Sequence, residues 1–302
     1  MKQHQLLALV AVADHGGINA AARALHLTQP AITKAIKDLE TGLGIRLLSR
    51  HTRGVNLTPE GETLLKRARL IVREMQRAQE DVGAMKGERG GRLSIGVTPL
   101  AGLTILPRAF SLFRAAWPEV ELNFIEYTSD QLYDKLQQGA LDFAVAATTG
   151  QEPAGSLASE PLCSLRTSLA VHRDSPLARC TQLRELHDAE WIHTDITDRF
   201  PAFLAALFGQ HGLKPPRRVT RCTSQALFHS LAMQNDVVFF WSLFAIGMPL
   251  LRERFTPLPV AQDLPRLNMS LLVREDGLLT RAAEDFVRCI RDVAQEEWAA
   301  VD

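Results

Sequence analysis

Two short helical patterns separated by a tight turn, within residues 19–40, constrain the fold of this chain more than any other feature. The first is the alanine-rich run Ala20–Leu25, whose small side chains permit a close crossing by a neighbouring helix, and we expect Asn19 to cap it. The second pattern begins directly after the turn at His26 and Leu27. Such a pair predicts a helix-turn-helix, the motif that places its second helix in the major groove of DNA.

The second helix of the pair has an apolar face and a polar face. Thr28 is its expected N-cap, and Ile32, Ile36 and Leu39 form one apolar stripe at i, i+4 and i+7. The opposite face carries amide, hydroxyl and ammonium groups that suit base edges and phosphates. The alternative is a solvated amphipathic helix, which leaves the preceding short helix and turn unexplained. The candidate DNA-binding residues here are Asn19, Thr28, Gln29, Pro30, Thr33, Lys34 and Lys37.

Residues 45–57 predict a β-hairpin with a basic tip. Ile45–Leu48 and Val55–Leu57 are the expected strands, and the segment between them contains a glycine. Basic side chains at such a tip are placed for phosphates or the minor groove, where they add affinity more than sequence discrimination. The candidate residues are Arg50, His51 and Arg53.

The distribution of charge supports a polyanionic partner. Residues 1–92 contain 15 Lys and Arg but 9 Asp and Glu, whereas the remaining residues contain 19 and 25, so that the net charge of zero conceals a basic N-terminal part. Segregated positive charge of this kind favours binding to a polyanion such as double-stranded DNA.

A long amphipathic helix is expected after the hairpin. Thr58 is its predicted N-cap and Pro59 its first residue. Apolar residues then alternate steps of four and three, as in a coiled-coil seam, which predicts dimerisation with a second copy; packing of this stripe against its own chain is the alternative. Glycines within residues 83–91 predict a hinge-like linker to the next domain. The seam residues are Leu64, Ala68, Ile71, Met75, Ala78, Val82 and Met85.

From residue 92 onwards, predicted strands and helices alternate, as in a mainly parallel, helix-covered sheet. The expected elements in the first half are Leu93–Val97, Leu103–Ala116, Val120–Tyr127, Leu132–Gln138 and Leu141–Ala147. A second set follows at Leu165–Val171, Trp191–His193, Phe200–His211, Arg218–Cys222, Gln225–Asn235 and Val237–Trp241, and the chain finishes with Leu267–Val273 and Thr280–Trp298.

Ligands of open α/β sheets bind where strands end and helix N-termini present free amides. Hydroxyl groups follow several of the predicted strands, and together with backbone amides they suit a carboxylate or similar oxyanion. Phe200, Phe203 and Trp241 are placed to flank an apolar or aromatic body. For each hydroxyl, an ordinary helix cap is the alternative. The candidate effector-binding residues are Thr98, Pro99, Leu100, Ala101, Thr128, Ser129, Thr148, Thr149, Thr194, Phe200, Thr223 and Trp241.

The N-terminal sixty residues resemble the signature of the LysR family of bacterial transcription regulators. The resemblance lies in Ala20–Leu25, Thr28–Thr33, Ile36, Leu39-Glu40, Leu43-Gly44, Leu47-Leu48, Arg50, Arg53, Leu57-Thr58 and Gly61. Further on, Gly96-Val97-Thr98-Pro99 and Leu136 with Gly139-Ala140-Leu141-Asp142 resemble the effector domain of that family, although Glu126-Tyr127 stands where Glu-Gly is frequent.

This resemblance implies an α+β multidomain fold: a winged helix-turn-helix at 1–58, a linker and dimerisation helix with a hinge at 59–91, and an α/β, two-lobed, periplasmic-binding-protein-like effector domain at 92–302. Lobe I comprises about 93–163 and 267–302, and lobe II about 164–266. It also implies a homodimer that assembles into a tetramer, with RNA polymerase as a further expected partner. Effector binding between the lobes would change their angle and the spacing of the DNA-binding units.

Other classes of function find little support. No GxSxG, Walker or dinucleotide motif is present, so that we expect neither an enzyme nor a cofactor. The four cysteines are dispersed, and His193 with Asp195 and Asp198 lacks a recognised metal-ligand spacing. The rival class is a transport-type solute-binding protein, but no export signal or membrane-spanning run is evident, and we expect a cytoplasmic protein.

Overall fold

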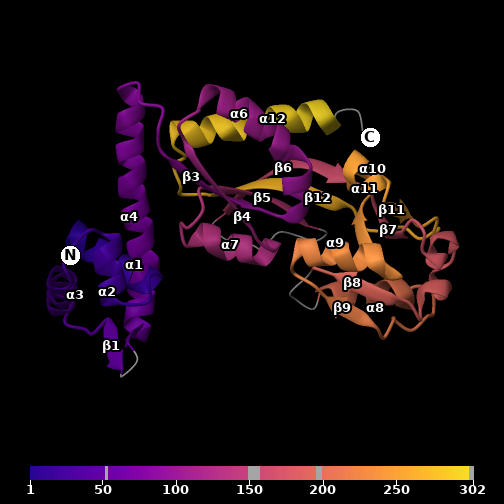
Figure 1. Cartoon of the computed structure of the whole chain (residues 1–302), viewed down its shortest axis with the longest axis horizontal. Coiled ribbons are helices and arrows are strands. Elements are labelled where there is room, and N and C mark those ends of the chain that lie inside the picture. Colours follow the sequence, from indigo (N-terminus) through magenta and orange to yellow (C-terminus); the bar gives the residue numbers. More distant parts are fainter. Residues whose placement is uncertain (52–53, 149–156, 195–198, 299–302) are drawn as a thin grey trace.

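The computed structural model describes residues 1–51, 54–148, 157–194 and 199–298. The long helix α4 (Pro59–Met85) stands between a small N-terminal unit and two α/β lobes (Figure 1). Its N-cap is Thr58, whose hydroxyl accepts a hydrogen bond from the Gly61 N–H (3.0 Å), as the sequence predicted. None of the described helices combines the length and apolar character that crossing a membrane requires.

The N-terminal unit consists of three helices and a hairpin: α1 (Gln3–Asp14), α2 (Ile18–Ala24), α3 (Gln29–Leu43), β1 (Leu48–His51) and β2 (Gly54–Leu57). The predicted apolar stripe of α3 is its buried face, since Ile32, Ile36 and Leu39 are each at most 4% exposed. α3 ends at Gly44, which adopts a left-handed conformation (φ 69°) that closes a helix with little strain in glycine.

Two local predictions for this unit were wrong. Asn19 does not cap α2: it lies inside the helix, exposed, and Gly17 occupies the N-cap position. The first hairpin strand begins at Leu48 rather than Ile45, because the Glu40 carboxylate accepts hydrogen bonds from the backbone N–H groups of Leu47 (2.7 Å) and Leu48 (3.1 Å) and ties the approach to the hairpin to α3.

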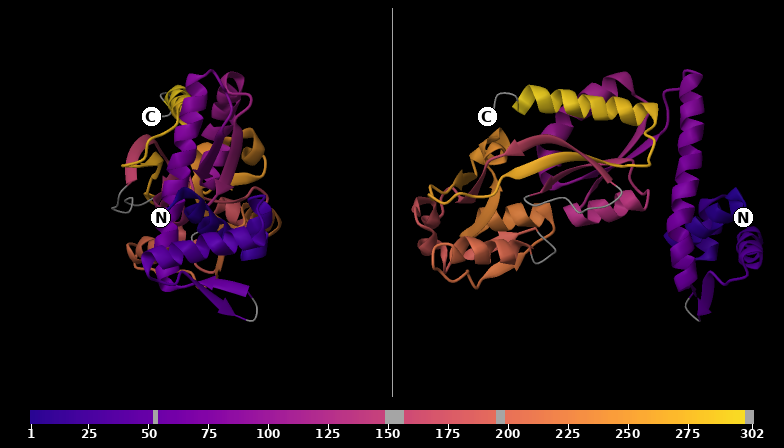
Figure 2. Two further views of the ribbon diagram at one scale, coloured as in Figure 1. Left: turned by 90° about the vertical axis from the view of Figure 1, so that its left-hand side faces the viewer. Right: turned by 180° about the vertical axis from the view of Figure 1, so that it is seen from behind.

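Lobe I contains a five-stranded sheet in the order β4-β3-β5-β12-β6. Helices α6 and α12 cover one face and α7 the other (Figures 1 and 2). The strands are β3 (Arg92–Val97), β4 (Glu121–Glu126), β5 (Phe143–Thr148), β6 (Leu157–Leu165) and β12 (Leu267–Arg274), and the helices are α5 (Pro99–Leu103), α6 (Ile105–Ala116), α7 (Ser129–Gln137) and α12 (Arg281–Trp298).

Lobe II contains a second five-stranded sheet, in the order β11-β7-β10-β8-β9. Its strands are β7 (Thr167–His172), β8 (Glu190–His193), β9 (Val219–Arg221), β10 (Val237–Ser242) and β11 (Phe255–Pro257). Its helical segments are α8 (Arg199–Gly209), α9 (Gln225–Gln234), α10 (Leu243–Gly247), α11 (Pro249–Arg252) and the 3-10 turns Pro176–Arg179 and Leu183–Leu186. The chain passes between the two sheets twice, after β6 and before β12.

Both sheets are mixed, which corrects the expectation of mainly parallel pairing. In lobe I, β3 pairs in parallel with β4 and β5, whereas β12 is antiparallel to β5 and β6. Strand β6 was not predicted, because it contains Pro161 and polar residues; it lies at the edge of the sheet and its register shifts beside that proline, where a missing N–H is tolerated.

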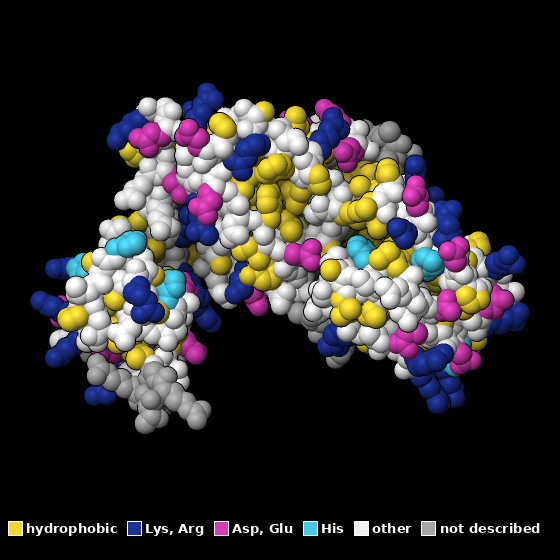
Figure 3. Space-filling view, in the orientation of Figure 1, with side chains coloured by type: hydrophobic (Ala, Val, Ile, Leu, Met, Phe, Trp, Pro, Cys, Tyr) yellow, Lys and Arg dark blue, Asp and Glu magenta, His cyan; other side chains and the backbone are white. Residues whose placement is uncertain are grey.

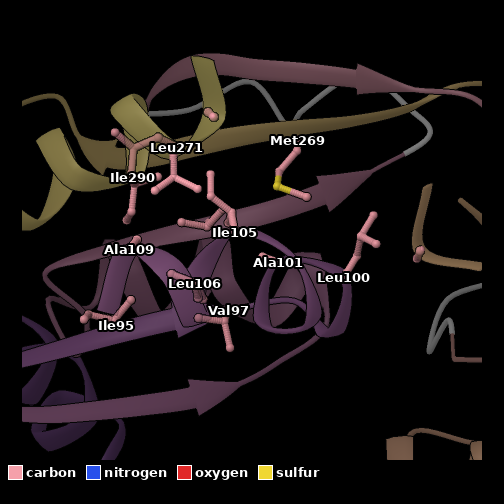
Figure 4. Close-up of a cluster of buried hydrophobic side chains, with 14 of the residues drawn as sticks. Ile95, Val97, Leu100, Ala101, Ile105, Leu106, Ala109, Met269, Leu271 and Ile290 are labelled. Atoms are coloured by element: carbon pink, nitrogen blue, oxygen red, sulfur yellow. The ribbon is translucent and has the colours of Figure 1, made fainter. Parts of the chain in front are cut away.

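The core of lobe I joins elements that are far apart in the sequence. Phe286 of α12 stacks on Phe113 of α6, with ring centroids 4.5 Å apart. Figure 4 shows other buried side chains of the same cluster directed toward one another, among them Ile95, Val97, Ile105, Leu106, Ala109, Met269, Leu271 and Ile290. The packing of β12 and α12 against the first half of the lobe fixes the sheet whose ends form the site described next.

Candidate effector pocket and DNA-binding surface

A cavity of about 670 Å³ lies between the two lobes. Its walls are formed where strands of both sheets end, as the strand-end rule predicts for open α/β sheets. Its volume falls within the range usual for small-molecule sites. The lining residues from lobe I are Thr98, Pro99, Leu100, Glu126–Gln131, Ala147 and Thr148; those from lobe II and the connection are Ile192, His193, Thr194, Arg199, Phe200, Phe203, Thr223, Gln225, Phe228, Phe240, Trp241, Pro265 and Leu267.

Most of the predicted effector-binding residues lie on this lining. Ala101 does not, because it is fully buried in α5, and Thr149 lies outside the described residues. The remaining residues come from segments separated by up to 143 positions in the chain, between Thr98 and Trp241, and the fold brings them to one cavity.

The lobe I wall is rich in hydroxyls, but they are not equivalent. The Thr98 hydroxyl accepts a hydrogen bond from the Ala147 N–H (3.0 Å), and the Ser129 hydroxyl donates to the Ala147 carbonyl (3.2 Å). The Thr128 hydroxyl is buried and has no hydrogen-bond partner among the described residues. It stands at the N-terminus of α7, where backbone N–H groups favour an anion.

The lobe II wall is largely aromatic. The ring of His193 stacks on Phe200 (centroids 4.4 Å apart), and Phe200 and Phe203 contact each other at 5.8 Å. Trp241, another lobe II residue of the lining, stacks on His229 (5.5 Å), and burial lowers the pKa of that imidazole. The cavity therefore has a polar side from lobe I and an aromatic side from lobe II.

One ion pair joins the two lobes at the cavity. Arg199 at the start of α8 donates a hydrogen bond to the Asp130 carboxylate in α7 (2.9 Å), and both residues line the pocket. The sequence analysis did not single out Asp130, although it directly follows Ser129. A strand-end position alone does not reveal which charged neighbour turns toward a cavity. Other lining residues that it missed include His193, Phe228 and Phe240.

The DNA-binding candidates of α3 lie on the exposed side of the N-terminal unit. Thr28, Gln29, Pro30, Lys34 and Lys37 are exposed. Thr33 is only partly exposed, and its hydroxyl is buried with no hydrogen-bond partner in the described part of the chain. Figure 3 shows Lys and Arg side chains at the outer edge of this unit, on the side where Figure 1 places α3.

The hairpin candidates are described less completely. Arg50 and His51 belong to β1, whose strand pairs with β2 in antiparallel register. Arg53 lies outside the described residues.

The environments of the cysteines do not favour thiol chemistry. Burial raises the pKa of Cys163 to about 12, and it also raises the pKa values of Cys180 and Cys289. Cys222 is buried, and its thiol donates to the Ser224 carbonyl (3.4 Å). Reactive cysteines require a depressed pKa, because the thiolate is the nucleophile. Among the residues that the structure describes, no group of three His, Cys, Asp or Glu side chains is placed to hold a metal ion.

Comparison with protein families gives two matches. Residues 3–62 match the model "Bacterial regulatory helix-turn-helix protein, lysR family", and residues 86–295 match "LysR substrate binding domain". The hydrogen peroxide-inducible genes activator of Dickeya chrysanthemi is 33% identical over 293 residues, which cover 95% of this chain and 94% of that protein.

Several solved structures resemble the chain over almost its whole length. Full-length OxyR from Pseudomonas aeruginosa superposes with a TM-score of 0.71 at 21% identity, covering 96% of this chain and 95% of that one. Full-length CbnR, solved in complex with its target DNA, gives a TM-score of 0.66 at 23% identity and covers 97% of this chain and 100% of that one.

Proposed function

The chain belongs to the LysR family of bacterial transcription regulators, and from this premise we propose that it binds promoter DNA through α3 and that a small organic acid in the cavity between the lobes regulates this binding. The observation that carries the proposal is the presence, in one chain, of an exposed polar helix face on a helix-turn-helix unit and a two-sided cavity in a substrate-binding domain. A transport-type solute-binding protein would not need the helix-turn-helix unit.

The DNA-binding part of the proposal rests on the exposed face of α3. Gln29 lies in the first turn of the helix, where recognition helices contact base edges, and its amide matches the adenine edge. Lys34 and Lys37 are exposed one and two turns further along and supply charge for phosphates. CbnR, a similar protein, has been solved with its target DNA, which supports the same mode here.

The effector part rests on the two unlike sides of the cavity. A carboxylate fits the lobe I side, where the buried Thr128 hydroxyl and the N-terminus of α7 offer hydrogen bonds. An aromatic or aliphatic body fits against Phe200, Phe203 and Trp241 on the other side.

The charges of the lining narrow the class of ligand. The guanidinium of Arg199 is already paired with Asp130, and Glu126 adds a second carboxylate. An anion would therefore be bound by hydroxyls and backbone dipoles rather than by a dedicated cation. This arrangement favours a molecule with one carboxylate over a phosphate ester or a polycarboxylate.

We place the working boundaries at 1–58, 59–91 and 92–302, and propose that α4 mediates a homodimer. Tetramer formation through the effector domains has support from charge at the two sheet edges. The β4 edge of lobe I exposes Glu121 and Glu126, whereas the chain around β9 of lobe II exposes Arg217 and Arg218. Opposite charges on the two edges favour a head-to-tail pairing of lobes.

The DNA-binding proposal is tested by selecting genomic fragments on the purified full chain and measuring affinity by fluorescence anisotropy. Gln29→Ala should weaken binding to the selected site by about 1–3 kcal/mol and relax the preference at one base position. Gln76→Ala, an equally exposed glutamine in α4, should leave binding unchanged. No selection of any fragment over random competitor at moderate salt would refute the DNA-binding assignment.

The effector proposal is tested with pairs of molecules that differ in charge. Benzoate, phenylacetate and hexanoate should raise the melting temperature of the full chain more than benzamide, phenylacetamide and hexanamide, because a ligand of the folded state stabilises it. Thr128→Val removes one hydroxyl at nearly constant volume and should reduce the shift. Thr256→Val, in β11 and outside the cavity, should not. Equal shifts by acids and amides would contradict the carboxylate assignment.

A further inference from the structure

A cluster of charged side chains joins α4 to lobe I. It consists of Arg73, Glu74 and Arg77 of α4 with Asp142 and Arg274 of lobe I, and is called here the α4–lobe I cluster. Asp142 is its centre. Arg77 donates to Asp142 Oδ1 from Nε (3.0 Å) and Nη2 (2.8 Å), while Arg73 Nη2 donates to Asp142 Oδ2 (2.8 Å).

The centre of the cluster is buried although it is made of charges, whereas Glu74 at its edge is 41% exposed. The side chain of Asp142 is 2% exposed, that of Arg77 5% and that of Arg73 16%. The second oxygen of Asp142 also accepts the Ser94 N–H (2.8 Å). A buried ion pair adds little net stability over apolar packing, but a displacement that leaves one of its charges unpaired is strongly disfavoured. The cluster therefore specifies one arrangement of α4 on lobe I.

Close packing beside the cluster also restricts α4 to one arrangement on lobe I. Gly139, in the turn before Asp142, approaches α4 so closely that an added Cβ would lie 2.5 Å from Leu70 Cδ2. On the other side, Arg274 Nη2 donates to the Glu74 carboxylate (2.8 Å) and Glu74 in turn pairs with Arg77. The glycine-containing segment 86–91 is thus not the only connection between α4 and the effector domain.

The three central strands of lobe I connect this cluster to the cavity. β3 begins at Arg92, whose carbonyl accepts a hydrogen bond from Arg73 (2.8 Å), and is followed by Thr98 of the lining. β5 begins directly after Asp142 and ends at Thr148 of the lining. β12 runs the other way, from Leu267 at the cavity to Arg274. Each strand has one end at the cavity and the other at α4.

We propose that the α4–lobe I cluster transmits occupation of the cavity to the DNA-binding unit. It holds lobe I, α4 and the DNA-binding unit on α4 as one body, so that effector binding turns this whole body relative to lobe II. This inference rests on the proposed function, since it names the route by which the same cavity regulates DNA binding. Asp142, Arg73 and Arg77 act as positioning residues; none of them contacts the cavity or the exposed face of α3.

The faces of α4 permit this role together with dimerisation. Leu70, Arg73, Arg77 and Asp81 follow one another at helical spacing and face lobe I. The exposed apolar residues Ile71, Met75, Val82 and Met85 occupy an adjacent face. A second chain bound to that face leaves the cluster intact, so that a dimer contact and lobe I are held by the same helix.

The first test measures amide hydrogen exchange of the full chain without any ligand. Asp142→Asn should speed exchange across residues 86–94 while leaving α1, α2 and α3 as in the wild type. Asp134→Asn, an exposed carboxylate of α7, should change neither region. Unchanged exchange across 86–94 in Asp142→Asn would overturn the proposal. If that variant does not fold, Arg274→Gln replaces it, with Arg288→Gln on the exposed side of α12 as its control.

The second test measures coupling between ligand and DNA, with benzoate, phenylacetate and hexanoate as probes. Coupled sites commonly change each other's affinity by about 5- to 150-fold. In Asp142→Asn, the probe alone and the selected DNA alone should each bind about as in the wild type. The factor by which the probe changes the affinity for DNA should fall to about 1. Full coupling in the variant would overturn the proposal. If the wild type itself shows no coupling, the proposed regulation fails, and hydrogen exchange still decides whether the cluster unites α4 and lobe I.

Discussion

At the scale of single residues, the hydrogen bonds already made within the protein distinguish side chains that look alike in the sequence. Thr98 and Thr128 both follow strands of lobe I and both precede helices. The Thr98 hydroxyl accepts a hydrogen bond from the Ala147 N–H of β5. Replacing Thr98 with valine would leave that partly buried N–H without its partner. The Thr128 side chain stands in the capping box of α7 with Gln131, but its hydroxyl makes no hydrogen bond among the described residues, which makes it the sharper probe of ligand binding.

His229 provides a pH-dependent prediction at the same scale. Burial lowers the pKa of its imidazole, which stacks on Trp241 and contacts Gln225 (3.0 Å). Because the unfolded chain then takes up this proton more readily than the folded chain, the free energy of unfolding should decrease as the pH falls through about 6.5. Urea denaturation at about pH 7.5 and pH 5.5 measures this loss.

Replacement of the histidine separates its contribution from those of other groups. His229→Gln should show a smaller loss of stability on acidification than the wild type, whereas His211→Gln, at an exposed position, should retain the full loss. Identical pH dependence in the two variants would remove His229 as the cause.

At the scale of elements, the start of α4 shows why one glycine of the N-terminal signature is needed. Gly61 lies in the first turn of α4, and a Cβ there would lie 2.1 Å from the backbone carbonyl oxygen of Leu47, just before the hairpin. The Thr58 N–H donates to the same oxygen (2.9 Å). The first turn of α4 therefore packs directly against the backbone that leads into the hairpin. Only glycine at position 61 allows the two backbones to approach so closely.

Gly61→Ala should destabilise the N-terminal unit by about 1–3 kcal/mol, the usual cost of overfilling a packed site. Gly42→Ala is the matched control, because Gly42 lies in α3 with nothing within 4 Å of an added Cβ. That change should stabilise the helix by about 0.5–1 kcal/mol. Thermal unfolding followed by circular dichroism measures both; a neutral Gly61→Ala would show that the hairpin shifts to accommodate the methyl group.

At the scale of the whole molecule, α4 is the element that joins the N-terminal unit to lobe I. Its N-terminal half packs on α1 through Leu65, Ala68 and Val72, and its C-terminal half contacts lobe I. Part of the predicted seam therefore packs against the same chain: Ala68 is buried among residues of the N-terminal unit. The remainder is exposed: Val82 is 50% and Met85 84% accessible. An exposed apolar stripe of this kind is the surface that the proposed dimer would cover.

Val82→Glu should raise the dimer dissociation constant at least about tenfold, which corresponds to about 1.4 kcal/mol. The reason is that a two-fold interface would bury the new carboxylate twice. Gln76→Glu introduces the same charge on another exposed face of α4 and should leave association unchanged. Sedimentation of both variants measures the effect, with circular dichroism to confirm the fold. Equal dimerisation of the two would place the dimer contact elsewhere.

The sequence by itself determined those features that depend on neighbours along the chain. Helix caps, the apolar stripe of α3, the start of α4 at Pro59 and the strand-end positions of the cavity follow from local spacing, since a helix or strand presents its residues at a fixed period. The exceptions were local competitors, such as Gly17 in place of Asn19 at the start of α2 and the Glu40 carboxylate before β1.

Only the tertiary structure decided which distant residues meet. Arg77 and Asp142 are 65 positions apart and Glu74 and Arg274 are 200 apart, and no periodicity links them. The pairing of Arg199 with Asp130 and the addition of the Pro161-containing strand β6 to the sheet edge are of the same kind. Periodicity specifies which face of an element is apolar, whereas the partner of a buried charge depends on how whole elements pack together, and this packing is settled by the fold.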